Sequence, residues 1–256
     1  LYNQKMNIFF YDVAISVPLR QCFTYSSNLK IDKGSRVLVP FGNRKVIGIV
    51  IKKSKAVIGN NIEIKKIISK IDAHPVFNKS IFNTILWSSE YYHHPIGEVF
   101  NTFIPNQLRK ANNKVIEPLA VEESYQISIN EKENRFDLTS DQSKALKQLL
   151  KLNSFQPSLL YGVTGSGKTE VYLRLVENCI KDGKSALILV PEINLTPQLF
   201  NRFTSRFNGE IGLYHSRQTP TQRLKVWLNA RFGNIKIVIG TRSAVLMPMK
   251  NIGLIV

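Results

Sequence analysis

The stretch Gly162-Val163-Thr164-Gly165-Ser166-Gly167-Lys168-Thr169 constrains the fold more than any other part of the chain. It matches the pattern G-x-x-x-x-G-K-[ST] at every fixed position. The four residues before it, Ser158-Leu159-Leu160-Tyr161, form a short apolar run that predicts a buried strand. The residues after it, 170–181, carry apolar side chains close to helical spacing. Strand, glycine-rich loop and helix in this order are the context of a phosphate-binding loop.

The residue types of this loop suit a nucleoside triphosphate. Glycines let backbone N–H groups turn toward phosphates at a helix N-terminus. Lys168 would neutralise the β- and γ-phosphates, and the Thr169 hydroxyl would hold Mg²⁺. The plainer alternative is a glycine-rich turn that only caps a helix. Because all fixed positions match in the right context, we expect a bound nucleotide, with ATP and Mg²⁺ as the cofactors.

Length and composition set the broad class. With 256 residues and 43% hydrophobic content, the chain is long and apolar enough for two globular domains. No apolar run approaches the roughly 18 residues that a membrane span needs, and residues 1–6 lack a signal core. Cys22 and Cys179 lie far apart without metal-ligand spacing, which indicates reduced thiols. We therefore expect a cytoplasmic protein without a membrane partner.

The formal charge of +17 indicates a polyanionic partner. Residues 30–70 hold eleven Lys or Arg against Asp32 and Glu63, a net charge of +9 in one block. A clustered basic surface favours nucleic acid. A bland alternative also explains the charge, because the chain is rich in Lys, Asn and Ile, as proteins from AT-rich genomes are.

The first part of the chain, residues 1–110, is predicted to be a β-rich module or small β-barrel with a trailing helix. Apolar segments at 8–15, 35–40 and 46–51 predict strands, and Gly and Pro residues separate them. Apolar spacing over 79–92 predicts the helix. The adjacent His93 and His94 are favoured as structural residues, because no further ligand cluster accompanies them.

Residues 111–135 are polar and weakly periodic, and they predict a linker with one strand near 116–121. The second domain, residues 136–256, opens with Thr139 as a plausible N-cap and Gln142 in the capping-box position. Gln142 is either only part of this cap, or a glutamine upstream of the phosphate-binding loop that hydrogen-bonds adenine.

Strands and helices alternate in the second domain. Strands are predicted at 186–190, 211–213, 235–239 and 254–256, with helices at 197–206 and 222–231 between them. This alternation predicts a doubly wound parallel sheet, in which ligands gather at the C-terminal strand ends. Polar turns follow three of these strands at Pro191-Glu192, His215-Ser216 and Thr241-Arg242-Ser243, so we expect a site at that edge.

With these pieces placed, the chain resembles the primosomal protein N′ (PriA) family of replication-restart DNA helicases of superfamily 2. The matching segments are GVTGSGKTE at 162–170, VPEINLTPQ at 190–198, VIGTRSA at 238–244, VPFG at 39–42, GIV at 48–50 and YYHHPIG at 91–97. The resemblance runs from about Tyr11 to Val256 and excludes the linker. It implies an α/β multi-domain chain, in which a small β-rich DNA-binding module precedes a RecA-like P-loop lobe.

For the first module, the resemblance implies a domain that captures the 3′ end of a nascent strand at a stalled fork. The residues that match the family's end-binding pocket are Phe23, Tyr25, Gly42 and Lys65. The family's acidic contact is replaced by Thr24, a neutral and weaker acceptor for a terminal hydroxyl, which counts against selective end capture. Phe23 and Tyr25 could stack a terminal base or could simply be core residues.

For the second domain, the resemblance implies the first lobe of a 3′-to-5′ helicase. It supports an adenine contact for Gln142 and makes two segments the contacts to single-stranded DNA. The residues expected there are Pro191, Glu192, Thr196, Thr241, Arg242 and Ser243, with Arg242 paired to phosphate. Primosome proteins, single-stranded DNA-binding protein and forked DNA are the partners that the resemblance implies, in a bacterial cytoplasm.

Two departures from the family bear on activity. Residues 111–135 are too few for the winged-helix domain that the family usually places between the two modules. The chain also ends at Val256, before the family's Asp-Glu-Glu-His motif, second lobe and zinc-binding cysteines. We therefore expect little ATP hydrolysis by this polypeptide alone. One rival hypothesis is a truncated remnant that only binds DNA and nucleotide. A second is a P-loop kinase of small molecules, and the basic first module argues against it.

Overall fold

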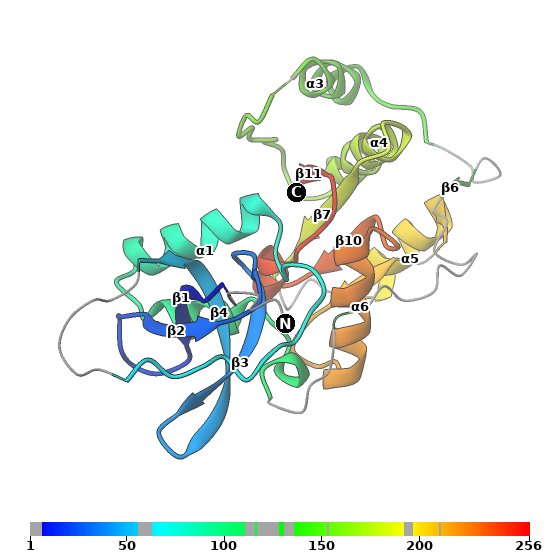
Figure 1. The fold of residues 1–256 in the computed structure, drawn as a ribbon. Coiled ribbons are helices and arrows are strands. Elements are labelled where there is room, and N and C mark those ends of the chain that lie inside the picture. Colours follow the sequence, from blue (N-terminus) through cyan, green and yellow to red (C-terminus); the bar gives the residue numbers. More distant parts are fainter. Residues whose placement is uncertain are drawn as a thin grey trace. The chain divides into compact units, whose positions relative to one another are not determined.

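The computed structural model describes residues 7–55, 63–110, 116, 128–130, 136–152, 154–191, 197–209 and 211–256. The chain divides into two compact units, Leu1–Glu117 and Pro118–Val256, which Figure 1 draws in blue to green and in green to red. Each unit has its own sheet and its own core. None of the helices within the described residues is long and apolar enough to cross a membrane.

The first unit is built on a five-stranded antiparallel sheet of order β2-β1-β4-β3-β5. Its strands are β1 (Phe9–Ile15), β2 (Phe23–Ser27), β3 (Arg36–Phe41), β4 (Arg44–Ser54) and β5 (Ser69–Lys70). A two-residue turn joins β3 to β4, with Gly42 at φ 55°. A positive φ at the first turn position suits glycine, so the sequence fixes this hairpin locally.

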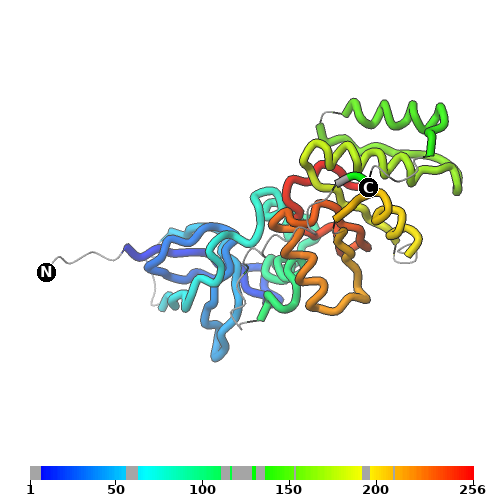
Figure 2. The backbone as a smooth tube through the Cα atoms, turned by 90° about the vertical axis from the view of Figure 1, so that its right-hand side faces the viewer, coloured from blue at the N-terminus to red at the C-terminus, as the bar shows by residue number. Residues whose placement is uncertain are grey.

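The sheet closes on itself through the segment that precedes β5. Ser26 of β2 donates its N–H to the Lys65 carbonyl at 3.0 Å, and Ile67 donates back to the Ser26 carbonyl at 2.8 Å. A few residues later the same segment pairs with β3, where Lys70 lies opposite Val37. Strands at opposite ends of the sheet order are thus linked, and the blue strands curl into a small barrel (Figure 2). The barrel core holds Tyr11, Val13, Ile15, Tyr25, Ile31, Val37, Val39 and Val50.

Two helices and a buried ion pair complete the first unit. Helix α1 (Lys79–Tyr91) begins at Asn78, whose side chain accepts from the Ile81 N–H at 2.8 Å. It is followed by α2 (Ile96–Thr102) and the short helix η1 (Asn106–Leu108). Arg36 of β3 donates to both carboxylate oxygens of Asp72 at 2.6 Å and to the Leu108 carbonyl, so the paired charges are also hydrogen-bonded.

The second unit is built on a four-stranded parallel sheet of order β11-β7-β10-β9. Its strands are β7 (Ser185–Leu189), β9 (Gly212–Tyr214), β10 (Ile237–Gly240) and β11 (Ile252–Ile255). The helices are α3 (Ser140–Leu150), α4 (Lys168–Lys181), α5 (Pro197–Arg206) and α6 (Pro220–Phe232), with η4 (Arg242–Leu246) after β10. A small separate pairing joins β6 (Ser128–Ile129) to β8 (Phe207–Asn208).

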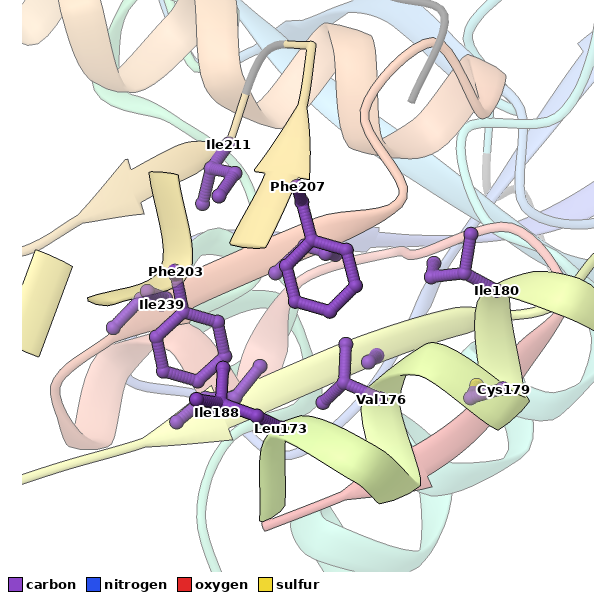
Figure 3. Close-up of a cluster of buried hydrophobic side chains, with 11 residues drawn as sticks. Leu173, Val176, Cys179, Ile180, Ile188, Phe203, Phe207, Ile211 and Ile239 are labelled. Atoms are coloured by element: carbon purple, nitrogen blue, oxygen red, sulfur yellow. The ribbon is translucent and has the colours of Figure 1, made fainter. Parts of the chain in front are cut away.

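Helices cover both faces of the parallel sheet. On one face, Leu173, Val176, Cys179 and Ile180 of α4 pack with Phe203 of α5, Phe207 and the strand residues Ile188 and Ile239 (Figure 3). On the other face, Val226 of α6 lies against Gly212 and Val238. Successive residues along a strand point to opposite faces of the sheet. Because both faces are covered here, the buried strands are continuous apolar runs. The predicted α/β class, a β-rich module followed by a doubly wound parallel sheet, is confirmed.

Some sequence-based predictions need correction. The strand expected at 158–161 is wrong, because the segment has no strand geometry and Leu159 and Tyr161 are 88% and 91% exposed. A strand needs a neighbour for its backbone groups, and no described strand pairs with this segment. Strand β2 and helix α2 were not predicted. Of the strand expected at 116–121, only Ile116 lies within the described residues, outside any strand.

Candidate functional site

The phosphate-binding loop leads directly into α4. Gly167 is the N-cap of this helix and has φ 76°, a left-handed conformation that glycine adopts without strain. The first N–H groups of a helix have no partner within the helix, and they carry partial positive charge. The loop and the first turn of α4 therefore present backbone N–H groups of the kind that bind phosphate.

Lys168 points back over the loop. Its ammonium donates to the carbonyls of Gly162 at 2.6 Å and Val163 at 2.9 Å. Beside it, Thr169 sits partly buried in the first turn of α4. No heavy atom lies within 4 Å of where a side chain on Gly165 would begin, so the loop stays open on that side. Glycine backbone, a cation and a hydroxyl within one turn fit a phosphate chain with its magnesium.

Gln142 contacts both its own helix and the phosphate-binding loop. Its Oε1 accepts from the Thr139 N–H at 3.0 Å, and Thr139 Oγ1 accepts from the Gln142 N–H, so the predicted capping box is confirmed. Its Nε2 donates to the Ser166 carbonyl at 2.9 Å. The amide also fills the space beside Gly167, where a Cβ would lie 2.5 Å from Nε2. Gln142 is thus a cap that also braces the loop, and an adenine contact remains a prediction.

An ion-pair network joins the loop's helix to α5. Glu170 accepts from Arg206 Nη2 and from Arg174 Nε, the latter at 2.9 Å. Arg206 also places Nη1 3.2 Å from Glu177 Oε1. Sequence analysis missed this network, although Glu170 directly follows the loop. Its second partner, Arg206, is 36 residues away in sequence.

The C-terminal edge of the parallel sheet gathers the predicted polar turns. The Thr241 N–H donates to the Tyr214 carbonyl at 3.1 Å, and the Val190 N–H donates to the Gly240 carbonyl at 2.9 Å. The turns that follow β7, β9 and β10 therefore lie side by side. Arg242 and Ser243 are exposed in η4, whereas Thr241 is buried. Pro191 belongs to this edge, while Glu192 and Thr196 lie outside the described residues.

His215 adds a titratable group to this edge. Burial lowers its pKa below the ordinary histidine value, and the charges of Arg217 and Arg223 lower it further. The Arg223 guanidinium lies 4.7 Å from the centre of the Tyr214 ring and donates to the Tyr214 hydroxyl at 3.1 Å. The edge is therefore basic, and His215 takes up a proton less readily than an ordinary histidine.

In the first unit, Phe23 and Tyr25 lie close to the hairpin that contains Gly42. The rings of Phe23 and Phe41, the residue before Gly42, lie edge to face with centroids 5.1 Å apart. The Tyr25 hydroxyl donates to the Pro40 carbonyl at 2.9 Å. Tyr25 is a buried core residue whose pKa is raised by burial, so it is not an exposed stacking surface. Phe23 is half-buried and Lys65 is exposed.

Thr24 faces away from this aromatic group, because neighbouring residues of a strand point to opposite faces. Its hydroxyl donates to Asp12 Oδ1 at 3.1 Å. Lys52 of β4 places its ammonium 3.7 Å from Asp12 Oδ2. Asp12 and Lys52 were missed by sequence analysis. The available signal was one carboxylate in the otherwise apolar strand Phe9–Ile15.

The paired histidines have local partners. His94 Nε2 lies 3.0 Å from Glu98 Oε2, and the His93 carbonyl accepts from Arg20. Within the described ranges, no group of three or more His, Cys, Asp or Glu side chains is placed to hold a metal ion. Cys22 and Cys179 are free thiols, in line with the sequence expectation.

Comparison with known proteins identifies both units. Residues 12–105 match the model of a 3′DNA-binding domain, and residues 139–256 match the model of DEAD/DEAH box helicases. A unit similar to a 3′DNA-binding domain, followed by a unit similar to DEAD/DEAH box helicases, defines the class of protein that the chain resembles. More particularly, the chain belongs to the PriA family of replication restart proteins.

Three relatives illustrate the match. The replication restart protein PriA of Haemophilus influenzae is 34% identical over 95% of this chain, and that of Rickettsia conorii is 32% identical over 90%. The PriA protein of Treponema pallidum is 31% identical over 96%. The chain spans 43%, 33% and 37% of the lengths of these three relatives.

Proposed function

We propose that this chain is the ATP-binding and DNA-binding part of a 3′-to-5′ DNA helicase that recognises stalled forks and initiates primosome assembly. The observation that supports it most is the phosphate-binding loop at the start of α4, in the unit that matches DEAD/DEAH box helicases. Residues 1–110 would be the 3′-end DNA-binding domain, 111–135 a linker and 136–256 the first RecA-like lobe. The partners would be forked and single-stranded DNA, primosome proteins and single-stranded DNA-binding protein, in the bacterial cytoplasm.

The division of labour follows from the residues. Gly162 to Thr169 would hold the phosphates of ATP, with Thr169 on Mg²⁺ and Gln142 near the base. Bound ATP supplies the free energy of phosphoryl-bond cleavage to the helicase. The Lys168 ammonium would then exchange its two loop carbonyls for phosphate oxygens, which bind a cation more strongly. Phe23, Thr24, Gly42 and Lys65 would form the DNA-end site, with Tyr25 supporting it from the core, and the sheet edge with Pro191 and Thr241 to Ser243 would contact single-stranded DNA.

A chain that retains binding but has no enzyme role is the second candidate. The neutral Thr24 supports it, because it removes the carboxylate that the resemblance leads one to expect. The intact mass of the protein purified from its native cell separates the two. Peptides running past Val256 would support the helicase, and a mass near 29.2 kDa would support the binding module.

The proposal is tested by Lys168→Ala. We expect loss of binding to a fluorescent ATP analogue and unchanged binding to a labelled single-stranded DNA, because Lys168 is not among the residues proposed to contact DNA in either unit. Lys181→Ala, an exposed lysine at the end of the same helix, is the matched control and should alter neither. If Lys168→Ala abolished both activities while the protein stayed folded, the assignment of the two activities to separate sets of residues would be wrong.

A further inference from the structure

Asp12 and Thr24 form a directly opposed pair across two strands. Strand β1 runs antiparallel to β2, and the register places Asp12 opposite Thr24. Opposed side chains of antiparallel strands lie on the same face. The Thr24 hydroxyl confirms this by donating to Asp12 Oδ1 at 3.1 Å. A carboxylate at position 12 therefore reaches the space that a carboxylate at position 24 would occupy.

The Asp12 carboxylate has acceptor capacity to spare. An ionised carboxylate offers about four lone-pair sites on its two oxygens. Thr24 uses one of them on Oδ1, and the Lys52 ammonium stands 3.7 Å from Oδ2, beyond ordinary hydrogen-bond distance. The Asp12 side chain keeps 18% of its surface exposed, so a ligand can reach it. The site is thus built to accept one more donor from solvent.

Lys52 removes the electrostatic objection to a carboxylate at a DNA site. It lies opposite Asp12 on β4, so Thr24, Asp12 and Lys52 form a row across three adjacent strands. Its side chain is 71% exposed and offsets the carboxylate charge that would otherwise repel phosphates. The same ammonium can pair with a backbone phosphate. Asp12 can accept a hydrogen bond from a hydroxyl, and Lys52 can pair with a phosphate. The terminal nucleotide of a DNA strand carries one group of each kind.

We propose that Asp12 supplies the carboxylate that accepts the terminal 3′-hydroxyl of bound DNA, so that the acidic contact has moved from β2 to the opposed position on β1. The inference rests on the proposed function and specifies its end-binding step. Thr24 then acts as a positioning residue that holds the carboxylate, and Lys52 binds the adjoining phosphate. The neutral residue at position 24 does not remove 3′-end selectivity under this assignment.

The test compares two labelled single strands of one sequence, ending in a 3′-hydroxyl or in a 3′-deoxy sugar, by fluorescence anisotropy at one fixed salt concentration. The 3′-deoxy strand lacks only the hydroxyl donor. We expect the parent protein to prefer the hydroxyl end by roughly tenfold, as for a hydrogen bond to a charged group. Asp12→Asn, which keeps the shape and loses the charge, should cut this preference to about twofold or threefold.

Two further variants sharpen the test. Asp32→Asn removes an equal charge from an exposed site of the same unit, and it should leave the preference unchanged. The exchange of Asp12→Thr with Thr24→Asp returns the carboxylate to β2 and should restore the preference that Asp12→Thr alone removes. Lys52→Gln should weaken binding of both strands by a similar factor, because it acts on phosphate.

The possible outcomes separate this inference from the proposed function. If the parent protein binds neither strand, the proposed DNA-binding function is wrong. If it binds both strands equally, or if Asp12→Asn keeps the full preference, DNA binding stands and the role of Asp12 is wrong. Retention of the parent melting temperature in Asp12→Asn excludes misfolding as the cause of a lost preference, and the exchange variant provides a second check.

Discussion

Arg206 Nη2 lies 2.6 Å and 2.8 Å from the two carboxylate oxygens of Glu170, the first residue after the phosphate-binding loop. Arg206 is the last residue of α5 and is almost fully buried. The contact therefore fixes one end of α5 against the first turn of α4. The guanidinium meets Glu170 through Nη2 and lies 3.2 Å from Glu177 Oε1 through Nη1, so two carboxylates of α4 hold it. Helix α4, which starts at the phosphate-binding loop, is thus linked to α5 by a buried ion pair.

Removal of Arg206 should destabilise the second unit strongly. Arg206→Leu leaves Glu170 and Glu177 close together without the guanidinium between them, and breaking a buried pair costs about 3–5 kcal/mol. The measurement is urea unfolding followed by Trp227, a buried residue of α6, in a Trp87→Phe background where it is the only tryptophan. Arg202→Leu, on an exposed position of the same helix, should change the unfolding free energy by less than about 0.5 kcal/mol. Equal effects of the two variants would contradict this.

The two roles of Gln142 can be separated by one substitution. Gln142→Glu keeps an acceptor for the Thr139 N–H, as a capping box allows, but it cannot donate to the Ser166 carbonyl. We expect unchanged helix content by circular dichroism and a roughly tenfold loss of affinity for an ATP analogue, because a carboxylate then faces a carbonyl and bound phosphates.

A second capping box in the chain supplies the control. Gln222 of α6 occupies the same position relative to Thr219, and its side chain caps its own helix. Gln222→Glu should leave nucleotide affinity unchanged. If both variants weakened nucleotide binding alike, the effect would come from added charge and not from the contact with the loop.

The thiol of Cys22 reports on the charge of Asp12. Burial raises its pKa, the negative charge of Asp12 raises it further, and Lys52 lowers it. Asp12→Asn removes the second cause, so the pKa of Cys22 should fall and more thiolate should be present at mildly alkaline pH. The rate of reaction with a disulfide reagent, followed against pH, should shift to lower pH, with Cys22→Ser to assign the signal. An unchanged profile would mean that the Asp12 charge does not reach Cys22.

Acid should weaken the second unit through His215. Its pKa in the folded state lies below the unfolded value of about 6.5, so the unfolded chain binds the proton more readily. The neutral His215 therefore makes its full contribution to the unfolding free energy above about pH 6.5. This contribution declines as the pH falls toward the pKa of the folded state. His215→Gln should flatten this decline in urea unfolding followed by Trp227. His74→Gln, an exposed residue of the other unit, should not, and a slope unchanged by His215→Gln would contradict the assignment.

Local patterns predicted the elements that depend on local causes. Helix α5 has the bounds expected from its apolar spacing, and the Thr139–Gln142 cap forms as its motif predicts. The four strands of the parallel sheet lie within one or two residues of the apolar runs that predicted them. In each case the apolar pattern or the capping residues lie within a few positions of one another, so the local sequence is enough to predict the element.

Non-local pairings were beyond such patterns. The run before Gly162 is apolar, but burial also requires a neighbouring strand, and apolarity alone cannot supply one. Strand β2 reads Phe-Thr-Tyr-Ser-Ser, with too little apolar character to predict it. The position of Asp12 beside Thr24 follows from the register of two strands, which the sequence around either residue does not reveal.

Strand β11 ends the order of the parallel sheet, and β7 is its only neighbour among the described strands. Its outer backbone groups and the exposed Ile252 and Ile255 form an edge of the kind on which other chains can align. The formal charge of +17 keeps copies of the chain apart, and this repulsion reaches only about 10 Å in 0.1 M salt and about 3 Å in 1 M salt. Concentrated salt, which strips nucleic acid from a basic protein during purification, should therefore promote its self-association, and moderate ionic strength is the better storage condition.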